Sequence, residues 1–502
     1  MMRIVALRAI LAAMKILFVS SEVAPFAKAG GLGDVSAALP RQLAALGHDV
    51  RVVMPLYARV RQPGRAFTEV MPDVTFTMGP REVRFSVAEA PLPGTRVPVY
   101  FVRCPSLFDR PELYGSGEDE HLRFGVLSWV SLLICQHLKF APDIAHVNDW
   151  QSALVPLLLR SLFAWDRLFA ETRSVLTIHN LGHQGTFGAH AAYEVGLGPA
   201  LNLVHGDHLA AGRFGFLLSG ILHANAITTV SPTYAREIQT PAHGVGLDPF
   251  LRARRDALFG ILNGIDEAEW SPEVDRYLEH PYSAYDLTNK ELCKRDLVRS
   301  MALPYRPEAP VLGLVTRLVW QKGLDLCMGV LPRVLRTRGA QLVALGKGEP
   351  KYEWFFRSLM KVFPKQVAFQ AAFSEERAHA IEAGADLFLM PSRYEPCGLN
   401  QMYSLRYGTP PVVHRTGGLA DSVRPFVPPD GGSGTGFVFN DFDESGFAWA
   451  LNTALDTWIS TRGEHREHWR ALQRRGMAEP LGWQHRIGEY LDVYRFVAPG
   501  RE

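Results

Sequence analysis

The chain has 502 residues, of which 47% are hydrophobic, so it is long enough for two or three domains with large apolar cores. Its formal net charge of +2 is close to neutral and gives no argument for a nucleic acid or a membrane surface as partner. The five cysteines include no CxxC pair, which argues against a disulfide framework or a zinc site and favours a reducing, cytoplasmic location. The longest apolar stretch, 126–135, is too short to span a bilayer.

The N-terminal residues 1–13 carry two arginines and no acidic residue, a pattern that signal and transit sequences share. Because a strand is expected to begin directly after them, we interpret 1–13 as an extension outside the fold.

A glycine-rich stretch joins the first expected strand, 15–19, to the first expected helix, 35–46. Glycine permits a tight turn and a close approach of a ligand, and the N-terminus of the following helix is a natural seat for phosphate. Lys28 offers a cation for anionic oxygens, and Asp34 offers a carboxylate for sugar hydroxyls. An ordinary strand-to-helix turn with a solvated lysine explains the same pattern, and the spacing does not match the dinucleotide motif GxGxxG.

Alternating strands and helices continue through the first half, with a helix expected at about 121–138. The further strands are expected at 49–54, 74–78, 83–90, 97–104, 144–147, 174–178 and 226–230. Polar residues follow two of them, as Asn148 and Asp149 and as His179 and Asn180. Open α/β sheets bind ligands at such strand ends, so we expect these side chains at a binding site.

The alternation of expected strands and helices is interrupted at 244–272, where glycines and prolines indicate a hinge between domains. It resumes after this segment. Strands are expected at 311–316, 341–345, 366–369, 387–390 and 411–414. The sequence therefore predicts an α/β protein with two doubly wound domains and a ligand held in the cleft between them. We place the first domain at 14–262, the second at 263–482, and a C-terminal helix at 483–502 that returns to the first domain.

Two basic residues, Arg317 and Lys322, follow the first strand of the second domain. Together they could neutralise a departing diphosphate, although two solvated loop cations would look the same. In the same domain a triplet with Asp441 and Asp443 imitates the metal-binding DxD motif, but Asp443 is better interpreted as a helix cap.

A second group of motifs lies near the end of the second domain. Glu395 precedes a proline and a helix expected at 399–407, whose start could bind phosphate through backbone amides. Cys397 lies at this helix start, but the sequence offers it no base, so we favour packing or phosphate contact over a nucleophile. The turn 416–418 contains two more glycines and opens another helix, as the first glycine-rich stretch does.

These motifs together resemble glycosyltransferase family 5, the bacterial glycogen synthases and plant starch synthases. The matching stretches, in family order, are 28–35, 146–151, 179–185, 229–235, 263–266, 317 with 321–323, and 395–401. Tyr403 stands eight positions after Glu395, where the related family 4 usually carries a second glutamate, which favours family 5. The resemblance covers residues 14–485.

The resemblance implies a GT-B fold, with two Rossmann-like domains facing each other across a deep cleft. It implies retaining transfer of glucose from ADP-glucose to the non-reducing end of an α-1,4-glucan such as glycogen. No metal and no cofactor is expected. The residues leave the choice between ADP-glucose and UDP-glucose open, and they do not determine the oligomeric state.

The resemblance also implies roles for individual residues. The glucosyl unit would be held by His179, Asp149 and Glu395, and the diphosphate by Arg317 and Lys322. The further substrate-binding residues would be Lys28, Gly30, Gly31, Asp34, Tyr114, Asn180, Gln184, Asn263, Cys397, Gly398, Leu399, Thr416, Gly417 and Gly418. No pair of carboxylates suggests a double displacement, so we expect same-face attack in which the leaving phosphate takes the acceptor proton.

Three functions other than glucosyl transfer by a synthase are considered as alternatives. A glucan phosphorylase shares the architecture but needs a lysine that holds pyridoxal phosphate. A non-catalytic glucan-binding protein would not need Arg317, Lys322 and Glu395 together. An oxidoreductase with two Rossmann domains would be expected to carry GxGxxG, which the sequence lacks at its glycine turn.

Overall fold

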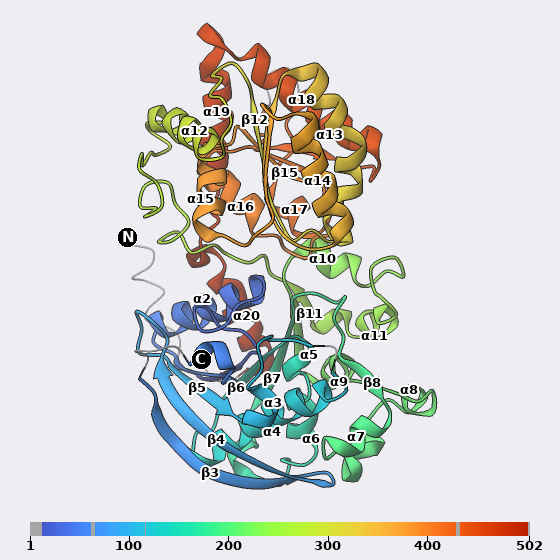
Figure 1. Cartoon of the computed structure of the whole chain (residues 1–502). Helices are drawn as coiled ribbons and strands as arrows, with labels where there is room; N and C mark the ends of the chain where they lie inside the picture. The colour runs from blue at the N-terminus through green and yellow to red at the C-terminus, as the bar shows by residue number, and fades with distance from the viewer. Residues whose placement is uncertain (1–12, 62–65, 116, 428–431, 500–502) are drawn as a thin grey trace. The chain divides into compact units, whose positions relative to one another are not determined.

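The computed structural model describes residues 13–61, 66–115, 117–427 and 432–499. The described chain forms two compact units (Figure 1), the first made of residues up to Ile261 together with those from Arg486 onward, and the second of Leu262–His485. The boundaries differ slightly from the expected ones, since the second unit begins one residue earlier and ends three residues later. The expected extension 1–13 lies outside the described residues except for its last residue.

The first unit is built on a sheet of nine described strands in the order β11-β10-β7-β6-β1-β2-β5-β4-β3. Neighbours from β11 to β5 run parallel, and β5-β4-β3 are antiparallel. A separate antiparallel pair joins β8 to β9. The strands are β1 (Lys15–Val19), β2 (Asp49–Pro55), β3 (Thr68–Met78), β4 (Arg81–Pro91), β5 (Pro98–Arg103), β6 (Ile144–Asn148), β7 (Arg173–Ile178), β8 (Thr186–Gly188), β9 (Arg213–Gly215), β10 (Ala226–Thr229) and β11 (Leu258–Gly260).

The parallel strands β1, β6 and β7 are almost entirely buried, as expected for strands with helices on both faces. The helices of this unit are α2 (Gly31–Ala45), α3 (Pro105–Phe108), α4 (Glu120–His137), α5 (Asp149–Ser152), α6 (Val155–Arg160), α7 (His190–Glu194), α8 (Gly206–Ala210), α9 (Phe216–His223), α10 (Pro232–Glu237), α11 (Asp248–Ala253) and α20 (Ile487–Val497). The segment 244–272, expected to be a hinge, is not wholly irregular, because it contains α11 and β11.

The second unit has a parallel sheet of six described strands in the order β14-β13-β12-β15-β16-β17. Its strands are β12 (Val311–Val315), β13 (Gln341–Leu345), β14 (Val367–Gln370), β15 (Leu387–Met390), β16 (Pro411–His414) and β17 (Phe437–Phe439). Its helices are α12 (Thr288–Ser300), α13 (Leu324–Arg338), α14 (Pro350–Val362), α15 (Glu375–Gly384), α16 (Asn400–Arg406), α17 (Gly417–Ser422), α18 (Glu444–Ser460) and α19 (Arg466–Met477). The strands predicted for both halves are therefore confirmed within one to a few residues, except that β3 begins earlier. Four described strands, β8, β9, β11 and β17, were not predicted.

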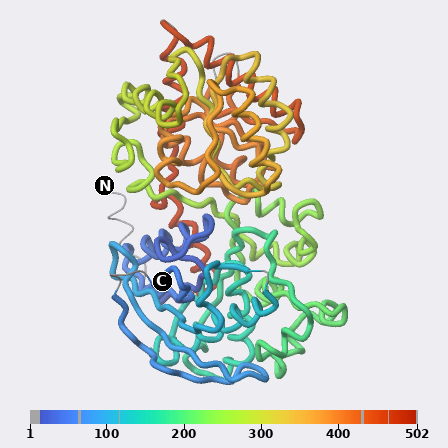
Figure 2. Tube along the Cα trace, in the orientation of Figure 1, coloured from blue at the N-terminus to red at the C-terminus, as the bar shows by residue number. Residues whose placement is uncertain are grey.

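The C-terminal helix α20 belongs to the first unit, as expected (Figure 2). It begins at Ile487 rather than at 483, because Trp483–His485 forms a separate 3-10 turn. The Tyr494 hydroxyl lies 2.7 Å from Nδ1 of His146 on β6, and Phe496 packs edge-on against Phe259 of β11. These contacts anchor the end of the chain to the sheet that carries the strand-end residues.

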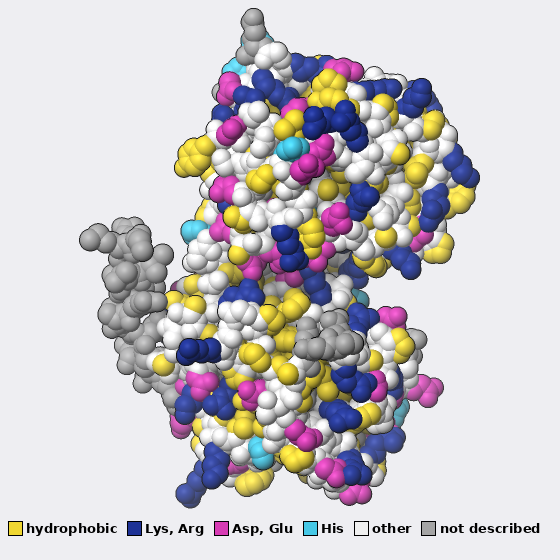
Figure 3. Space-filling view, turned by 60° about the vertical axis from the view of Figure 1, so that its left-hand side comes forward, with side chains coloured by type: hydrophobic (Ala, Val, Ile, Leu, Met, Phe, Trp, Pro, Cys, Tyr) yellow, Lys and Arg dark blue, Asp and Glu magenta, His cyan; other side chains and the backbone are white. Residues whose placement is uncertain are grey.

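Surface charge is mixed. On the face shown in Figure 3, Lys and Arg side chains are interspersed with Asp and Glu side chains, as expected from a net charge of +2. A search of the described residues finds no helix that is long and apolar enough to cross a membrane.

Candidate active site

The connection after β1 is held by a buried glutamate that the sequence analysis did not select. Glu22 is 4% exposed, and its Oε2 accepts hydrogen bonds from the amides of Ala29 at 2.6 Å and Gly30 at 3.2 Å. Its Oε1 accepts a hydrogen bond from the Tyr114 hydroxyl at 2.6 Å. Burial raises the pKa of Glu22, against the opposing effect of these three hydrogen bonds. Two amides of the glycine-rich stretch are thus already paired with a protein carboxylate.

The glycines of this stretch lie differently from the prediction. Helix α2 begins at Gly31 instead of Val35, so Gly31 and Gly33 lie in its first turn, and Gly30 is the N-cap in extended conformation. A Cβ at Gly30 would have no atom within 4 Å, so neither strain nor crowding requires glycine there. A Cβ at Gly33 would lie 3.2 Å from the Lys28 side chain, so this glycine lets the lysine pack closely.

Lys28 and Asp34 are brought together directly. The Lys28 Nζ lies 2.7 Å from the Asp34 carboxylate, with side chains 46% and 29% exposed. Asp34 also lies in the first turn of α2, where a negative charge is favoured by the helix dipole. Both charged groups are therefore partly accessible at the start of this helix, although they already form an ion pair with each other.

Asp149 lies at the end of β6 in a conformation that is uncommon for a residue with a side chain. Its φ is +52°, and its carboxylate accepts hydrogen bonds from the amides of His179 at 2.7 Å and Asn180 at 3.4 Å. Burial raises the pKa of Asp149 to about 7. Left-handed conformations outside glycine cluster at functional sites, and here the hydrogen bonds to the end of β7 hold this one in place.

His179 is held by the neighbouring strand end. Its Nε2 lies 3.0 Å from Oδ1 of Asn148, whose amide nitrogen donates to the carbonyl of Val19. Because Oδ1 only accepts, Nε2 carries the proton and Nδ1 keeps its lone pair. Burial lowers the pKa of His179 to about 3, so the imidazole is neutral at physiological pH.

Three other expected residues of the first unit have local partners. The Tyr114 hydroxyl lies 2.8 Å from Ser21 Oγ as well as bonding Glu22. The Asn180 side chain accepts a hydrogen bond from the amide of Gly182, and the Gln184 side chain donates to the carbonyl of Val245. Tyr114 therefore joins the Glu22 network, whereas Asn180 stabilises its own loop and Gln184 links its loop to the segment around Val245. We call Glu22, Lys28, Asp34, Tyr114, Asp149 and His179 the first-unit cluster.

In the second unit, the basic motif after β12 meets the glutamate motif after β15. The Lys322 Nζ lies 2.6 Å from Oε2 of Glu395, and Ser392 Oγ donates to the same oxygen at 2.9 Å. The Lys322 and Glu395 side chains are only 16% and 7% exposed. Arg317, on the connection after β12, is exposed. Burial raises the pKa of Tyr394, and the positive charge of Arg317 partly opposes this rise.

The glycine turn at 416–418 packs directly on the glutamate motif. Gly417 has a φ of +43°, and a Cβ there would lie 2.0 Å from the carbonyl oxygen of Glu395. A Cβ at Gly418 would lie 2.0 Å from the carbonyl oxygen of Cys397, and the Gly418 amide donates to the Glu395 carbonyl at 3.1 Å. Both glycines are required by this close contact, which joins the starts of α16 and α17.

The helix starts in this region fit the prediction within a residue. Leu399 is the N-cap of α16 and Thr416 that of α17, and Gly398 has a φ of +72°. Cys397 is 6% exposed, and Gln401 donates to its carbonyl at 3.0 Å, so the structure gives it a packing position. We call Arg317, Lys322, Glu395, Cys397–Leu399 and Thr416–Gly418 the second-unit cluster.

Asn263 has an unsatisfied polar atom. The residue is 4% exposed, and its Oδ1 has no hydrogen-bond partner among the described residues. A buried polar atom without a partner is costly, which makes this carboxamide a candidate for contact with a ligand.

The potential metal ligands lie elsewhere. Asp443 accepts from the amide of Gly446 at 2.7 Å and caps α18, as predicted. The search of the described residues finds one group of suitable composition, formed by Glu279, His280 and Asp296. It contains none of the predicted site residues, and Arg295 is already paired with its Asp296.

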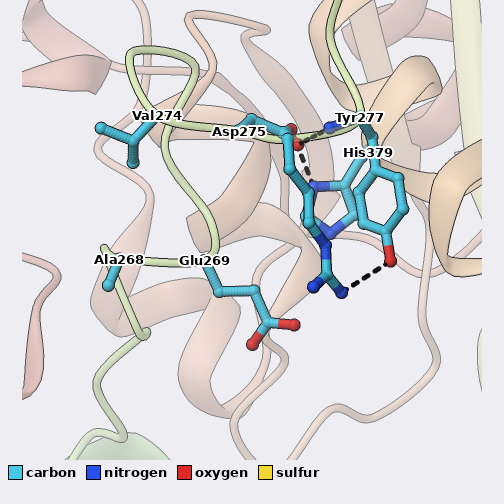
Figure 4. A pocket seen from close by; sticks show the side chains of 7 residues that line it. Ala268, Glu269, Val274, Asp275, Tyr277 and His379 are labelled. Carbon is cyan, nitrogen blue, oxygen red and sulfur yellow. Dashed lines mark hydrogen bonds and ion pairs between the residues drawn. The ribbon is translucent and has the colours of Figure 1, made fainter.

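A pocket of about 210 Å³ lies in the second unit on the segment 268–277 (Figure 4). Asp275 accepts hydrogen bonds from Nδ1 of His379 and from the Tyr407 hydroxyl. The Trp270 ring stacks between His379 and Tyr403 at centroid distances of 3.7 and 3.8 Å. None of these residues belongs to either cluster, so we interpret this arrangement, including Tyr403, as an anchor that fixes the start of the second unit to α15 and α16.

Comparisons with known proteins cover both units. The family model described as starch synthase catalytic domain matches residues 15–253, and that of glycosyl transferases group 1 matches residues 302–475. A glycogen synthase of Anaeromyxobacter sp. (strain Fw109-5) is 46% identical over 97% of this chain and 100% of the relative. A glycogen synthase of Myxococcus xanthus is 44% identical over 94% of this chain and 96% of the relative.

Solved structures extend the comparison to the fold. The catalytic domain of starch synthase IV from Arabidopsis thaliana, bound to ADP and acarbose, superposes with a TM-score of 0.88 at 33% identity, over 97% of this chain and 100% of that one. Sucrose-phosphate synthase from Thermosynechococcus elongatus superposes with a TM-score of 0.58 at 16% identity over 96% of this chain and 99% of that one, which supports the fold alone. The predicted GT-B fold is confirmed.

Proposed function

Because the chain belongs to the glycogen and starch synthase family of glycosyltransferases, we propose that it transfers glucose from ADP-glucose to the non-reducing end of an α-1,4-glucan with retention of configuration. The main support is the near-full-length match to the Arabidopsis starch synthase domain, which was solved bound to ADP and acarbose. ADP-glucose as donor and glycogen as acceptor are the specific parts of the proposal.

The second-unit cluster is assigned to the departing diphosphate. Lys322 is nearly buried and Arg317 is exposed on the same connection after β12, so we assign both cations to the charge that develops on the leaving oxygen. Fixed charges of this kind act most strongly on the charge of the transition state. Glu395 orients Lys322 through the ion pair of 2.6 Å, and its remaining oxygen is assigned to glucosyl hydroxyls.

The first-unit cluster is assigned to the glucosyl unit and the acceptor. A neutral His179 can face an oxocarbenium-like centre without repelling it, whereas a charged imidazolium would oppose it. Asp149 is assigned to the transferred sugar, with Lys28, Asp34 and Tyr114 around it. With a pKa of about 7, Asp149 is partly protonated near neutral pH, which makes it a poor nucleophile.

We therefore propose same-face attack. The bond from the anomeric carbon to the diphosphate oxygen breaks with its electron pair leaving on ADP. The acceptor hydroxyl then forms the new bond on the same face, and its proton passes to a phosphate oxygen. Arg317 and Lys322 supply the positive charge that a metal would supply elsewhere, and we propose that neither a metal nor a cofactor is needed. A cytoplasmic location is proposed from the cysteine pattern.

The proposal is tested by incubating the purified protein with glycogen and either ADP-[¹⁴C]glucose or UDP-[¹⁴C]glucose, with and without EDTA. We expect incorporation from ADP-glucose, at least tenfold weaker incorporation from UDP-glucose, and no effect of EDTA. Faster transfer from UDP-glucose would overturn the donor assignment, and loss of activity in EDTA would overturn metal independence. Activity that instead depends on phosphate and glucan, with visible absorbance from a bound aldimine, would identify a phosphorylase.

A further inference from the structure

Glu22 is buried at the centre of the first-unit cluster, yet nothing in the motif pattern selects it. It follows β1 as the last of three polar residues, Ser20, Ser21 and Glu22, at the same edge of the sheet as Asn148 at the end of β6 and His179 after β7. Its charge is near enough to Asp149 to contribute to the raised pKa of that residue. The side chain therefore lies among the residues assigned to the glucosyl unit.

We propose that Glu22 is a positioning residue for glucosyl transfer, which presets the Lys28–Gly31 turn through one carboxylate oxygen and the Tyr114 hydroxyl through the other. The inference rests on the proposed assignment of Lys28 and Tyr114 to substrate binding. Glu22 itself is not assigned a contact with substrate.

Glu22 holds the turn between Lys28 and α2. The amides of Ala29 and Gly30 both point at Oε2 of Glu22, so the backbone directly after Lys28 is held by a charge-assisted pair of hydrogen bonds. Gly30 has open space around it and adopts no conformation that by itself enforces the turn. The carboxylate, rather than local strain, therefore determines where the chain turns between Lys28 and α2.

Glu22 also sets the direction in which Tyr114 donates its hydroxyl proton. Tyr114 has one hydroxyl proton, which is donated to Oε1 of Glu22 at 2.6 Å. The contact of 2.8 Å with Ser21 must then have the serine as donor. The Tyr114 oxygen is thus left as an acceptor, so a substrate hydroxyl that reaches it must be the donor in that bond.

The substitution Glu22→Gln tests the positioning of Tyr114 while leaving the packing around residue 22 nearly unchanged. The carboxamide has nearly the same shape, and its oxygen can still accept from Ala29 and Gly30. Its amino group, however, must donate to Tyr114, which turns the tyrosine proton toward Ser21 or the substrate and reverses the polarity of that contact. We expect kcat to fall about 10- to 100-fold, with the KM for ADP-glucose and for glycogen changing less than about threefold, because the reacting groups are misaligned after binding.

The experiment measures kcat, both KM values and thermal unfolding for Glu22→Gln, Tyr114→Phe and the double variant, with Glu171→Gln as control. The control side chain is 78% exposed and in the same unit, and its variant is expected to match the wild type. In the Tyr114→Phe background, Glu22→Gln should change kcat less than about threefold, because the link through the hydroxyl is already lost.

The result that overturns the proposal is a wild-type kcat in Glu22→Gln, or equal effects of this change with and without the Tyr114 hydroxyl. A loss of activity that only follows a lower melting temperature also overturns it, because a structural role predicts that pattern. If Glu22→Gln does not fold, Glu22→Asp keeps the charge but is too short to reach both partners, and its effect on kcat should be smaller in the Tyr114→Phe background than in the wild type. A wild-type protein that transfers no glucose from any nucleotide sugar would instead refute the proposed function.

Discussion

Lys322 and Glu395 form a nearly buried ion pair of 2.6 Å although 73 residues separate them in the chain. One follows β12 and the other follows β15, which are neighbours in the parallel sheet of the second unit. The pair thus arises from the rule that the carboxyl ends of adjacent parallel strands meet at one edge. It also means that the main cation assigned to the diphosphate depends on a carboxylate for its position.

The first prediction concerns this pair. Lys322→Met should lower kcat on the order of 10²–10³-fold, because one fixed charge at the leaving group is lost while the buried Glu395 keeps its bond from Ser392. Steady-state kinetics with ADP-glucose and glycogen measure the effect. Lys351→Met is the control, since that lysine is exposed and pairs with Glu349 on the surface. Equal kcat values for the two variants would contradict the assignment.

The second prediction concerns the pH dependence of Asp149. Its pKa is about 7 in the folded protein and about 3.8 when unfolded, so between these values the folded state binds the extra proton. The contribution of Asp149 to stability is therefore lost as pH rises from about 4 to about 7, by an amount on the order of 4 kcal/mol. Asn has nearly the same shape and tolerates a φ of +52°. We expect Asp149→Asn to melt higher than wild type at pH 8 but not at pH 4.5, while losing most activity.

Melting curves of the two proteins across this pH range provide the measurement. A difference in melting temperature that stays constant from pH 4.5 to pH 8 would show that Asp149 titrates normally. Asp256→Asn changes a side chain that is 97% exposed in the same unit, and it is expected to melt at the wild-type temperature at pH 8.

The third prediction concerns the glycine turn on the glutamate motif. Gly417→Ala places a Cβ 2.0 Å from the Glu395 carbonyl oxygen at a positive φ, so the backbone must shift at both motifs. Gly339→Ala has a similar positive φ but open space, so it carries the strain without the clash. We expect Gly339→Ala to cost about 1 kcal/mol of stability with normal kcat. Gly417→Ala should lower kcat at least tenfold, and a normal kcat would show that Glu395 does not depend on this turn.

The fourth prediction concerns the C-terminal helix. Tyr494→Phe removes the hydroxyl that bonds Nδ1 of the buried His146, leaving that nitrogen without this partner. A loss of about 1–3 kcal/mol is expected, seen as a lower melting temperature. Tyr285→Phe changes a side chain that is 96% exposed and should leave the melting temperature unaltered. Equal melting temperatures for both variants would show that the hydroxyl contributes nothing to anchoring α20.

Much of this molecule follows from sequence alone, for reasons that are local. The short apolar runs of β1 and β12, and the mostly apolar run of β6, favour buried parallel strands, and the polar residues that follow such strands lie at the sheet edge. Strand-end position therefore pointed to Asp149, His179 and Arg317 before any tertiary contact was known. The cap formed by Asp443 was predictable because a capping residue and its helix are neighbours in sequence.

Tertiary structure alone decided which groups pair. Glu22 meets Tyr114 across 92 positions, and Gly417 packs on Glu395 across 22, so no local pattern could show that one organises the other. The sequence predicted a phosphate seat at the start of the helix after the first glycine stretch, but it did not show that the fold pairs the amides of Ala29 and Gly30 with Glu22. The pKa values of Asp149 and His179 likewise depend on burial by distant segments, which residue order does not specify.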